Sequence, residues 1–187
     1  GGSKEIRPFD KEGFELLDSL ASLKMPMDIS HMSESAALPA LDRFEGPVLA
    51  SHSNARALLK GRPPERHLSD HTIRLLFDHG GVVGVVPYNK ILSPVWDLKS
   101  PPGTVTITNL VDQIDYYCQM AGDSNHVGIG SDLDGGFGYP KIPMEFSTIR
   151  DFQKLAPALK ERGYNDADIE NIFWKNWNKH LEAMLPR

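Results

Sequence analysis

The chain has 187 residues, of which 40% are hydrophobic and 24% charged, and it carries a net charge of −5 at pH 7. This length and balance are typical of one ordinary globular domain. The acidic balance argues against nucleic-acid binding, which needs a basic face for phosphate contacts. No run of about 18 apolar residues is present that could span a membrane. The expected partners are therefore small molecules or other proteins.

Cys118 is the only cysteine, so an internal disulfide is excluded. The cytoplasm is the default location, although a single cysteine does not exclude a secreted or periplasmic protein. The sequence opens with Gly1-Gly2-Ser3 and no methionine, which indicates a tag remnant or a cut within a longer protein. A signal peptide or anchor would then lie upstream, and the location stays open.

Predicted helices and strands alternate along the chain. Apolar residues at three- and four-residue spacing predict a first helix over 9–23, with Asp10 as its cap. Short apolar runs predict strands over 25–30, 47–51, 82–86 and 126–130. Helices are expected over 33–44, 69–79, 108–121, 147–162 and 166–185. This order predicts an α/β fold with a parallel sheet and right-handed crossovers.

Two of the predicted strands end in Ser-His. His31 and His52 are 52 − 31 = 21 residues apart, a spacing that fits one strand, one helical connection and the next strand. If these strands are parallel neighbours, both imidazoles emerge at the same carboxyl edge of the sheet. Imidazole is a good zinc ligand, and rigid strand ends can leave a coordination position open for substrate or water. The alternative is a structural, hydrogen-bonding role for either histidine.

A carboxylate and a guanidinium are the next candidates. Asp132 follows the last predicted strand between glycines, where it can bind a metal, orient a metal-bound water or act as a general base. Asp134 is expected to form the turn or to support Asp132. In the basic loop over 53–68, Arg66 lies beside the capped helix and is suited to hold a carboxylate bidentately. The other basic residues of this loop are interpreted as solvated.

The remaining candidates carry weaker signals. His67 and His71 have the i,i+4 spacing of a metal pair but are expected on the surface without a third ligand. His126 and His180 are interpreted as structural. The proline-rich segment over 87–105 is long enough to be a functional loop.

Five motifs in order give a resemblance to a known family. They are Asp-Ile-Ser-His at 28–31, Ser-His-Ser-Asn at 51–54, Glu-Arg-His-Leu-Ser-Asp at 65–70, Gly-Gly-Val-Val-Gly-Val at 80–85 and Val-Gly-Ile-Gly-Ser-Asp-Leu-Asp-Gly at 127–135. From about residue 8 to its end, the chain resembles the membrane dipeptidase family, also called renal dipeptidases. The resemblance implies a TIM-type barrel with two zinc ions, which hydrolyses dipeptides through a metal-activated hydroxide.

The resemblance also implies roles for individual residues. His31 and His52 look like the two histidine ligands of one zinc. Asp132 looks like the acid/base carboxylate beside the metals, and Arg66 looks like the residue that holds the C-terminal carboxylate of the substrate. Gly135 is expected to take part in substrate binding.

Part of the family pattern is missing from this chain. In the family, a His-x-Asp pair and a bridging glutamate in the N-terminal half complete the two-metal site, and no His-x-Asp occurs here. The expected fold is therefore one partial domain over 1–187, the C-terminal half of a (β/α)8 barrel with roughly four repeats and closing helices. Open strand edges need a cover, so we expect a partner: the N-terminal half of the same protein or a second copy.

The resemblance thus predicts a zinc dipeptidase of which this chain is one half, inactive alone. Two alternatives stay open. The segment over 87–105 departs from the family, with Pro87 inside the strand-end motif, so the substrate can be another small amide. The chain can also be a catalytically silent half-barrel that serves as a binding module.

Overall fold

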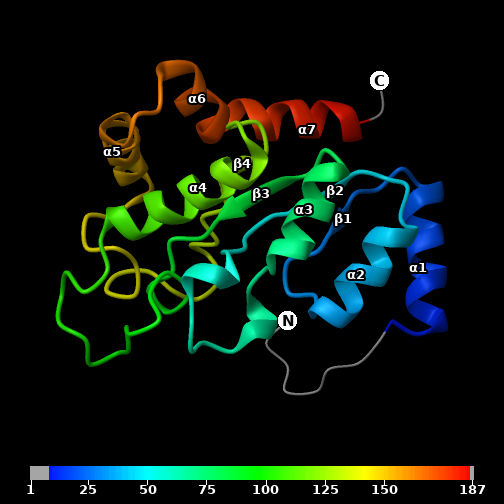
Figure 1. The fold of residues 1–187 in the computed structure, drawn as a ribbon, viewed down its shortest axis with the longest axis horizontal. Helices are drawn as coiled ribbons and strands as arrows, with labels where there is room; N and C mark the ends of the chain where they lie inside the picture. Colours follow the sequence, from blue (N-terminus) through cyan, green and yellow to red (C-terminus); the bar gives the residue numbers. More distant parts are fainter. Residues whose placement is uncertain (1–8, 186–187) are drawn as a thin grey trace.

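A parallel four-stranded sheet lies at the centre of the protein (Figure 1). The computed structural model describes residues 9–185, so the opening glycines interpreted as a tag remnant lie outside it. The strands are β1 (Met27–Asp28), β2 (Val48–Ala50), β3 (Val82–Val85) and β4 (Val127–Ile129), and they lie in chain order, each parallel to the next. The predicted α/β class with a parallel sheet is therefore confirmed, with shorter strands than expected.

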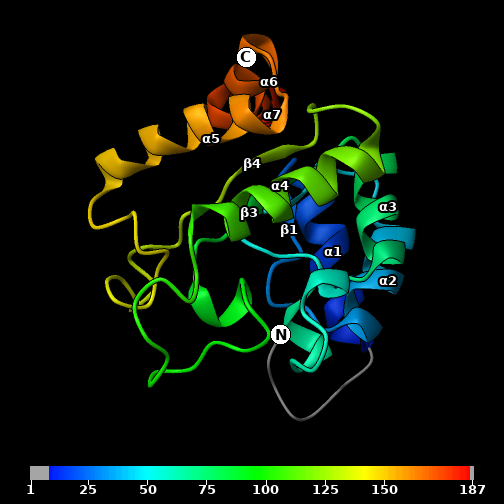
Figure 2. The same ribbon diagram turned by 60° about the vertical axis from the view of Figure 1, so that its left-hand side comes forward.

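Helices connect successive strands. Helix α1 (Lys11–Ser22) precedes the sheet, and α2 (Glu34–Arg43), α3 (Asp70–Asp78) and α4 (Ile107–Ala121) follow β1, β2 and β3. Helix α3 packs between α2 and α4, and Figures 1 and 2 show the three side by side along the sheet. Short 3₁₀ turns lie in the loops at η1 (Arg56–Leu58), η2 (Pro64–Arg66) and η3 (Asn89–Ile91). Among the described residues, no helix is long and apolar enough to cross a membrane.

Capping residues set the helix starts close to the predicted positions. The Asp10 carboxylate accepts the N–H of Gly13 at 2.8 Å, and the Ser69 hydroxyl accepts that of Thr72 at 3.2 Å. Pro39 lies inside α2, and the helix nevertheless continues to Arg43. One missing N–H costs one hydrogen bond, whereas the last turn of α2 buries Ala40 and Leu41 in the core.

The core lies between the sheet and this helical layer. Every residue of β3 is buried, as expected of a parallel strand covered on both faces. Leu76 of α3 and Ile114 and Tyr117 of α4 are fully buried in the same core. The rigid centre of the molecule is therefore the sheet whose carboxyl ends carry the candidate residues.

The C-terminal segment is less regular than predicted. It consists of the 3₁₀ segment η4 (Ile149–Lys154), α5 (Leu155–Arg162), α6 (Asp166–Glu170), the π-helical turn η5 (Asn171–Lys175) and α7 (Asn176–Met184). The helix expected over 147–162 thus begins as a 3₁₀ segment, and the helix expected over 166–185 contains a π turn. Turn η5 and helix α7 pack against β4.

Side chains of the last helix cover part of the β4 edge. The Asn176 side-chain amide donates to the carbonyl of Val127 at 2.8 Å, and the Trp177 indole N–H donates to that of Ile129 at 3.1 Å. These two carbonyls therefore have donors within the chain, and this part of the expected open edge is already covered.

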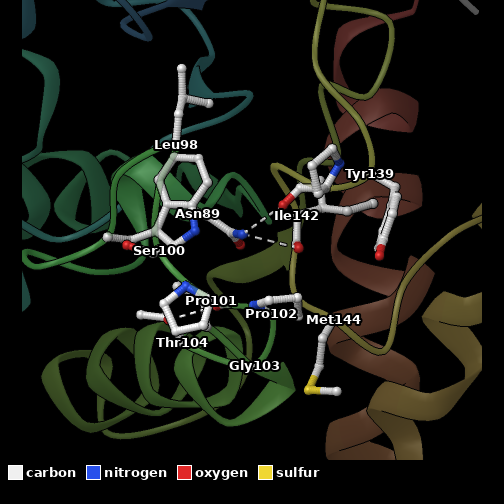
Figure 3. A pocket seen from close by; sticks show the side chains of 13 residues that line it. Asn89, Leu98, Ser100, Pro101, Pro102, Gly103, Thr104, Tyr139, Ile142 and Met144 are labelled. Atoms are coloured by element: carbon white, nitrogen blue, oxygen red, sulfur yellow. Dashed lines mark hydrogen bonds between the residues drawn. The ribbon is translucent and has the colours of Figure 1, made fainter.

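The loop over 87–105 is tied to the loop that follows β4. The buried Asn89 amide donates to the carbonyls of Pro140 and Ile142 (Figure 3). The ring of Tyr88 stacks on that of Phe137, with 4.5 Å between centroids. A cavity of about 140 Å³ lies between the two loops. The predicted loop is thus an ordered wall at the carboxyl end of the sheet.

Candidate functional site

The two histidines that follow β1 and β2 meet at the carboxyl edge of the sheet. The register pairs Asp28 with Leu49, so the residues three further on, His31 and His52, lie opposite each other. Their Nε2 atoms are 2.8 Å apart, and their ring centroids are 4.8 Å apart. The predicted convergence of two imidazoles at one edge is present in the structure.

Two of the candidate residues have a left-handed backbone conformation. His31 has a φ of +67° and Asp132 a φ of +48°. Such values are uncommon for residues other than glycine, cost free energy and cluster at functional sites. Backbone strain is therefore present at the two residues for which the metal-ligand and acid/base roles were expected.

Arg66 is the last residue of η2 and lies beside the histidines. Its Nη2 donates to the carbonyl of His52 at 3.2 Å, while its Nη1 is buried and has no hydrogen-bond partner among the described residues. Burial lowers the pKa of Arg66, and the nearby carboxylates of Asp132 and Asp28 oppose that shift. A half-buried guanidinium with an unused donor is suited to bind an anionic group.

Asp132 follows β4 and is held by a tight turn. Its carbonyl accepts the N–H of Gly135 at 2.9 Å. A Cβ atom at position 135 would lie 2.5 Å from Oδ1 of Asp132, so only glycine fits against this carboxylate. Gly135 therefore shapes the surroundings of Asp132, and its expected contact with substrate stays a prediction.

Glycines allow the carboxyl ends of three strands to converge. A Cβ atom on Gly84 of β3 or on Gly130 after β4 would lie well under 3.0 Å from the carbonyl oxygen of Ser51, and the two glycines also face each other. Gly130, two residues before Asp132, thus approaches the backbone of β3 and of the residue that follows β2. The close packing of these strand ends therefore requires glycine at both positions.

Substituting Gly130 tests that convergence. We expect Gly130→Ala to lower the free energy of unfolding by about 3 kcal/mol, because a methyl group would overlap two backbone segments that cannot move independently. Gly138→Ala is the matched control, since a Cβ atom there meets nothing within 4 Å. Urea unfolding followed by circular dichroism measures both, and equal midpoints would contradict the packing described.

The sequence contains five further histidines. His67 was expected on the surface, and that prediction is wrong: it is 4% exposed, and its Nδ1 has no partner among the described residues. The Nδ1 of His126 lies 2.8 Å from the carbonyl of Gly81, and His180 is buried, in agreement with structural roles. Among the described residues, no group of three or more His, Cys, Asp or Glu could hold a metal ion.

The buried His67 predicts a pH dependence of stability. Burial lowers its pKa to about 4, and the positive charges of Arg66, Arg56 and Arg62 act in the same direction. The unfolded chain takes up a proton near pH 6.5 and the folded chain only near pH 4, so stability is complete above pH 6.5 and declines as the pH falls between these values. We expect a loss of up to about 3 kcal/mol in this window, measured by urea unfolding. His67→Gln should flatten the slope, and an unchanged slope would contradict the assignment.

Two polar residues of the site received no role from the sequence. Asp28 and Ser51 belong to the two strand-end motifs, and the Ser51 hydroxyl lies between the Asp28 carboxylate and Nδ1 of His52. The recurrence of Ser before both histidines was the available signal. The link to Asp28 depends on the pairing of β1 with β2 and could not be read from spacing alone.

These residues fit part of a metal site. Two nitrogen ligands of one tetrahedral zinc lie roughly 3.3 Å apart. The two Nε2 atoms are 2.8 Å apart, so a small movement of either ring would bring them to that distance. Catalytic zinc needs three protein ligands, and the described residues bring two together here. The chain thus supplies an imidazole pair, and a complete site needs at least one further ligand.

Comparison with known proteins gives a family and several relatives. Residues 3–184 match the profile of the membrane dipeptidase family, peptidase family M19. An uncharacterized protein in the pqqA 5′ region of Klebsiella pneumoniae is 34% identical over 182 residues, which is 97% of this chain and 63% of that protein. Dipeptidase TcpJ of Claviceps purpurea is 28% identical over 167 residues, which is 88% of this chain and 36% of the relative.

Solved structures share the fold. A metallo peptidase from Rhodobacter sphaeroides, liganded with a phosphinate mimic of the dipeptide L-Ala-D-Ala, gives a TM-score of 0.82 at 24% identity, covering 96% of this chain and 48% of that one. The probable dipeptidase PvdM from Pseudomonas aeruginosa also gives 0.82, at 25% identity, covering 95% and 55%. The chain spans about half the length of these solved chains.

Proposed function

This chain belongs to the membrane dipeptidase family, peptidase family M19, and we propose that it forms the C-terminal half of a metal-dependent dipeptidase. The convergence of His31 and His52 beside Arg66 and Asp132 carries the proposal. An imidazole pair, a half-buried guanidinium and a strand-end carboxylate are among the groups that metal-assisted hydrolysis of a small anionic amide uses.

We assign each residue a role in the proposed reaction. His31 and His52 would hold one zinc ion, which when bound lowers the pKa of a coordinated water and polarises the scissile carbonyl. The free Nη1 of Arg66 would bind the C-terminal carboxylate of the dipeptide and fix its direction in the site. Asp132 would take the proton of the attacking water and deliver it to the leaving amine.

The sheet supports a half-barrel. Its four parallel strands lie in chain order, as in a (β/α)8 barrel, whereas a doubly wound sheet reverses direction at a switch point. The matched chains of known structure are about twice as long. Closing the barrel would place four more strands against this sheet and bring their carboxyl ends to the same face.

We propose that the remaining ligands come from a partner at this face, either the N-terminal half of the same protein or a second copy. Two nitrogen ligands from the described residues leave the metal site incomplete, and the chain alone should then be inactive. Analytical ultracentrifugation tests the partner directly. A monodisperse monomer that binds zinc and hydrolyses dipeptides without any second polypeptide would overturn this part.

Hydrolysis of simple dipeptides tests the function. The intact protein for this test is the present chain together with the partner that completes the metal site. With zinc present we expect release of free amino acids, and a chelator should abolish the activity until zinc is restored. Metal analysis should give near-stoichiometric zinc. Activity that is indifferent to the chelator would refute the metal role, and stoichiometric zinc without dipeptide hydrolysis would favour another small amide as substrate.

A further inference from the structure

A chain of hydrogen bonds runs from Asp28 through Ser51 to His52. Oδ1 of Asp28 accepts the backbone N–H groups of Ser30 at 2.8 Å and Ser51 at 3.1 Å, and Oδ2 accepts the Ser51 hydroxyl. The Ser51 oxygen lies 2.7 Å from Nδ1 of His52. These hydrogen bonds link the carboxyl ends of β1 and β2, next to the imidazole pair.

The direction of each hydrogen bond follows from the donors. A carboxylate only accepts, so the Ser51 proton points to Asp28. The Ser51 oxygen must then accept from His52, and Nδ1 of His52 carries the proton. Its Nε2 is left with a lone pair, directed at Nε2 of His31. A neutral imidazole with its proton on Nδ1 is the tautomer that binds a metal through Nε2.

The backbone holds the ring in place as well. The N–H of His52 donates to the Ser30 hydroxyl at 3.0 Å, and the carbonyl of His52 accepts from Arg66. Both backbone groups of His52 and its Nδ1 are thus engaged. Of the polar atoms of this residue, Nε2 is the one left to face the other imidazole.

We propose that Asp28 is a positioning residue which, acting through Ser51, sets the tautomer of His52 so that Nε2 presents its lone pair to the metal. The metal-binding role of His52 in this inference rests on the proposed function, whereas its tautomer is inferred from the hydrogen bonds alone. In this role Asp28 acts on His52 through the Ser51 hydroxyl and not as a ligand of the metal. Ligating histidines commonly donate their second N–H to a carboxylate, and here a serine hydroxyl extends that arrangement by one group.

The substitution Asp28→Asn changes the hydrogen-bonding groups of the side chain but keeps its size and shape. The asparagine oxygen can keep both backbone N–H groups, while its amide nitrogen replaces Oδ2 and donates to Ser51. The Ser51 proton then turns to Nδ1 of His52, and the proton of the imidazole moves to Nε2. The substitution therefore reverses the tautomer with almost no change of volume, and unfolding midpoints close to the wild-type value would confirm that the fold is intact.

Nitrogen-15 NMR of histidine-labelled, metal-free protein at pH 8 measures the tautomer. We expect His52 to show a protonated Nδ1 and an unprotonated Nε2 in the wild type, and the reverse in Asp28→Asn. Ser51→Ala should give a mixture of tautomers, and Ser51→Thr, which keeps the hydroxyl, should restore the wild-type pattern. Asp78→Asn, which removes an exposed carboxylate at the end of α3, should leave the spectrum unchanged.

Zinc binding to the intact protein is the second measurement. We expect Asp28→Asn to weaken zinc affinity by about 10- to 100-fold, with Ser51→Thr close to wild type. A wild-type His52 protonated on Nε2, or one tautomer shared by wild type and Asp28→Asn, would overturn the proposal. The NMR result does not depend on catalysis, so a reversed tautomer in a protein without dipeptidase activity would refute the proposed function and leave the tautomer control standing.

Discussion

Replacing His52 with alanine is expected to lower kcat/KM for dipeptide hydrolysis by at least roughly 10³-fold, because the metal supplies several kcal/mol of transition-state stabilisation and each 1.4 kcal/mol is a factor of ten. The intact variant protein should also lose its bound zinc, measured by elemental analysis. Addition of excess zinc should recover little activity, since the described residues hold only one other imidazole at this site.

The stability of the protein should change far less than its activity. The side chain of His52 is only partly buried, and its carbonyl, which accepts from Arg66, is kept in the variant. His71→Ala is the matched control, because His71 lies exposed on α3 away from the pair. An unchanged rate in His52→Ala, or an equal loss in the control, would refute the assignment of His52 to the metal.

The histidine pair could be predicted because the two Ser-His motifs end apolar runs and their 21-residue spacing fits one strand–helix–strand unit. Each Ser-His follows a short apolar run, and parallel pairing without a shift brings the two strand ends to one edge. The cap at Asp10 was predictable because a cap acts within three residues of its own position. Ends of strands and helices are where sequence reasoning was most informative here.

Long-range contacts account for what sequence reasoning missed. His67 is adjacent to Arg66 in a basic loop, and nothing local indicates that it is buried. The cover of the β4 edge by Asn176 and Trp177 joins residues nearly 50 positions apart. The link from Asp28 to Ser51 crosses two strands. Such contacts follow from tertiary packing, which overrides local propensity.

Arg66 offers the sharpest test of substrate binding. We expect Arg66→Met to lower kcat/KM for dipeptides by at least about 10²-fold, because two hydrogen bonds to a charged group contribute about 1.5–3 kcal/mol each. The loss should appear mainly in KM, since the carboxylate is bound equally in the ground state and in the transition state. Arg66→Lys should retain part of the affinity, as it keeps the charge and loses the bidentate geometry.

A dipeptide amide isolates the proposed contact. If Arg66 binds the C-terminal carboxylate, the wild type should discriminate strongly against a substrate in which that carboxylate is an amide, and Arg66→Met should not. The coupling between the two changes then measures the contact itself, free of any general effect of the substitution on the site. Arg74→Met, on the exposed face of α3, should behave as the wild type toward both substrates. Equal discrimination by wild type and Arg66→Met would show that the carboxylate is bound elsewhere, and the buried Nη1 of Arg66 would then need another partner.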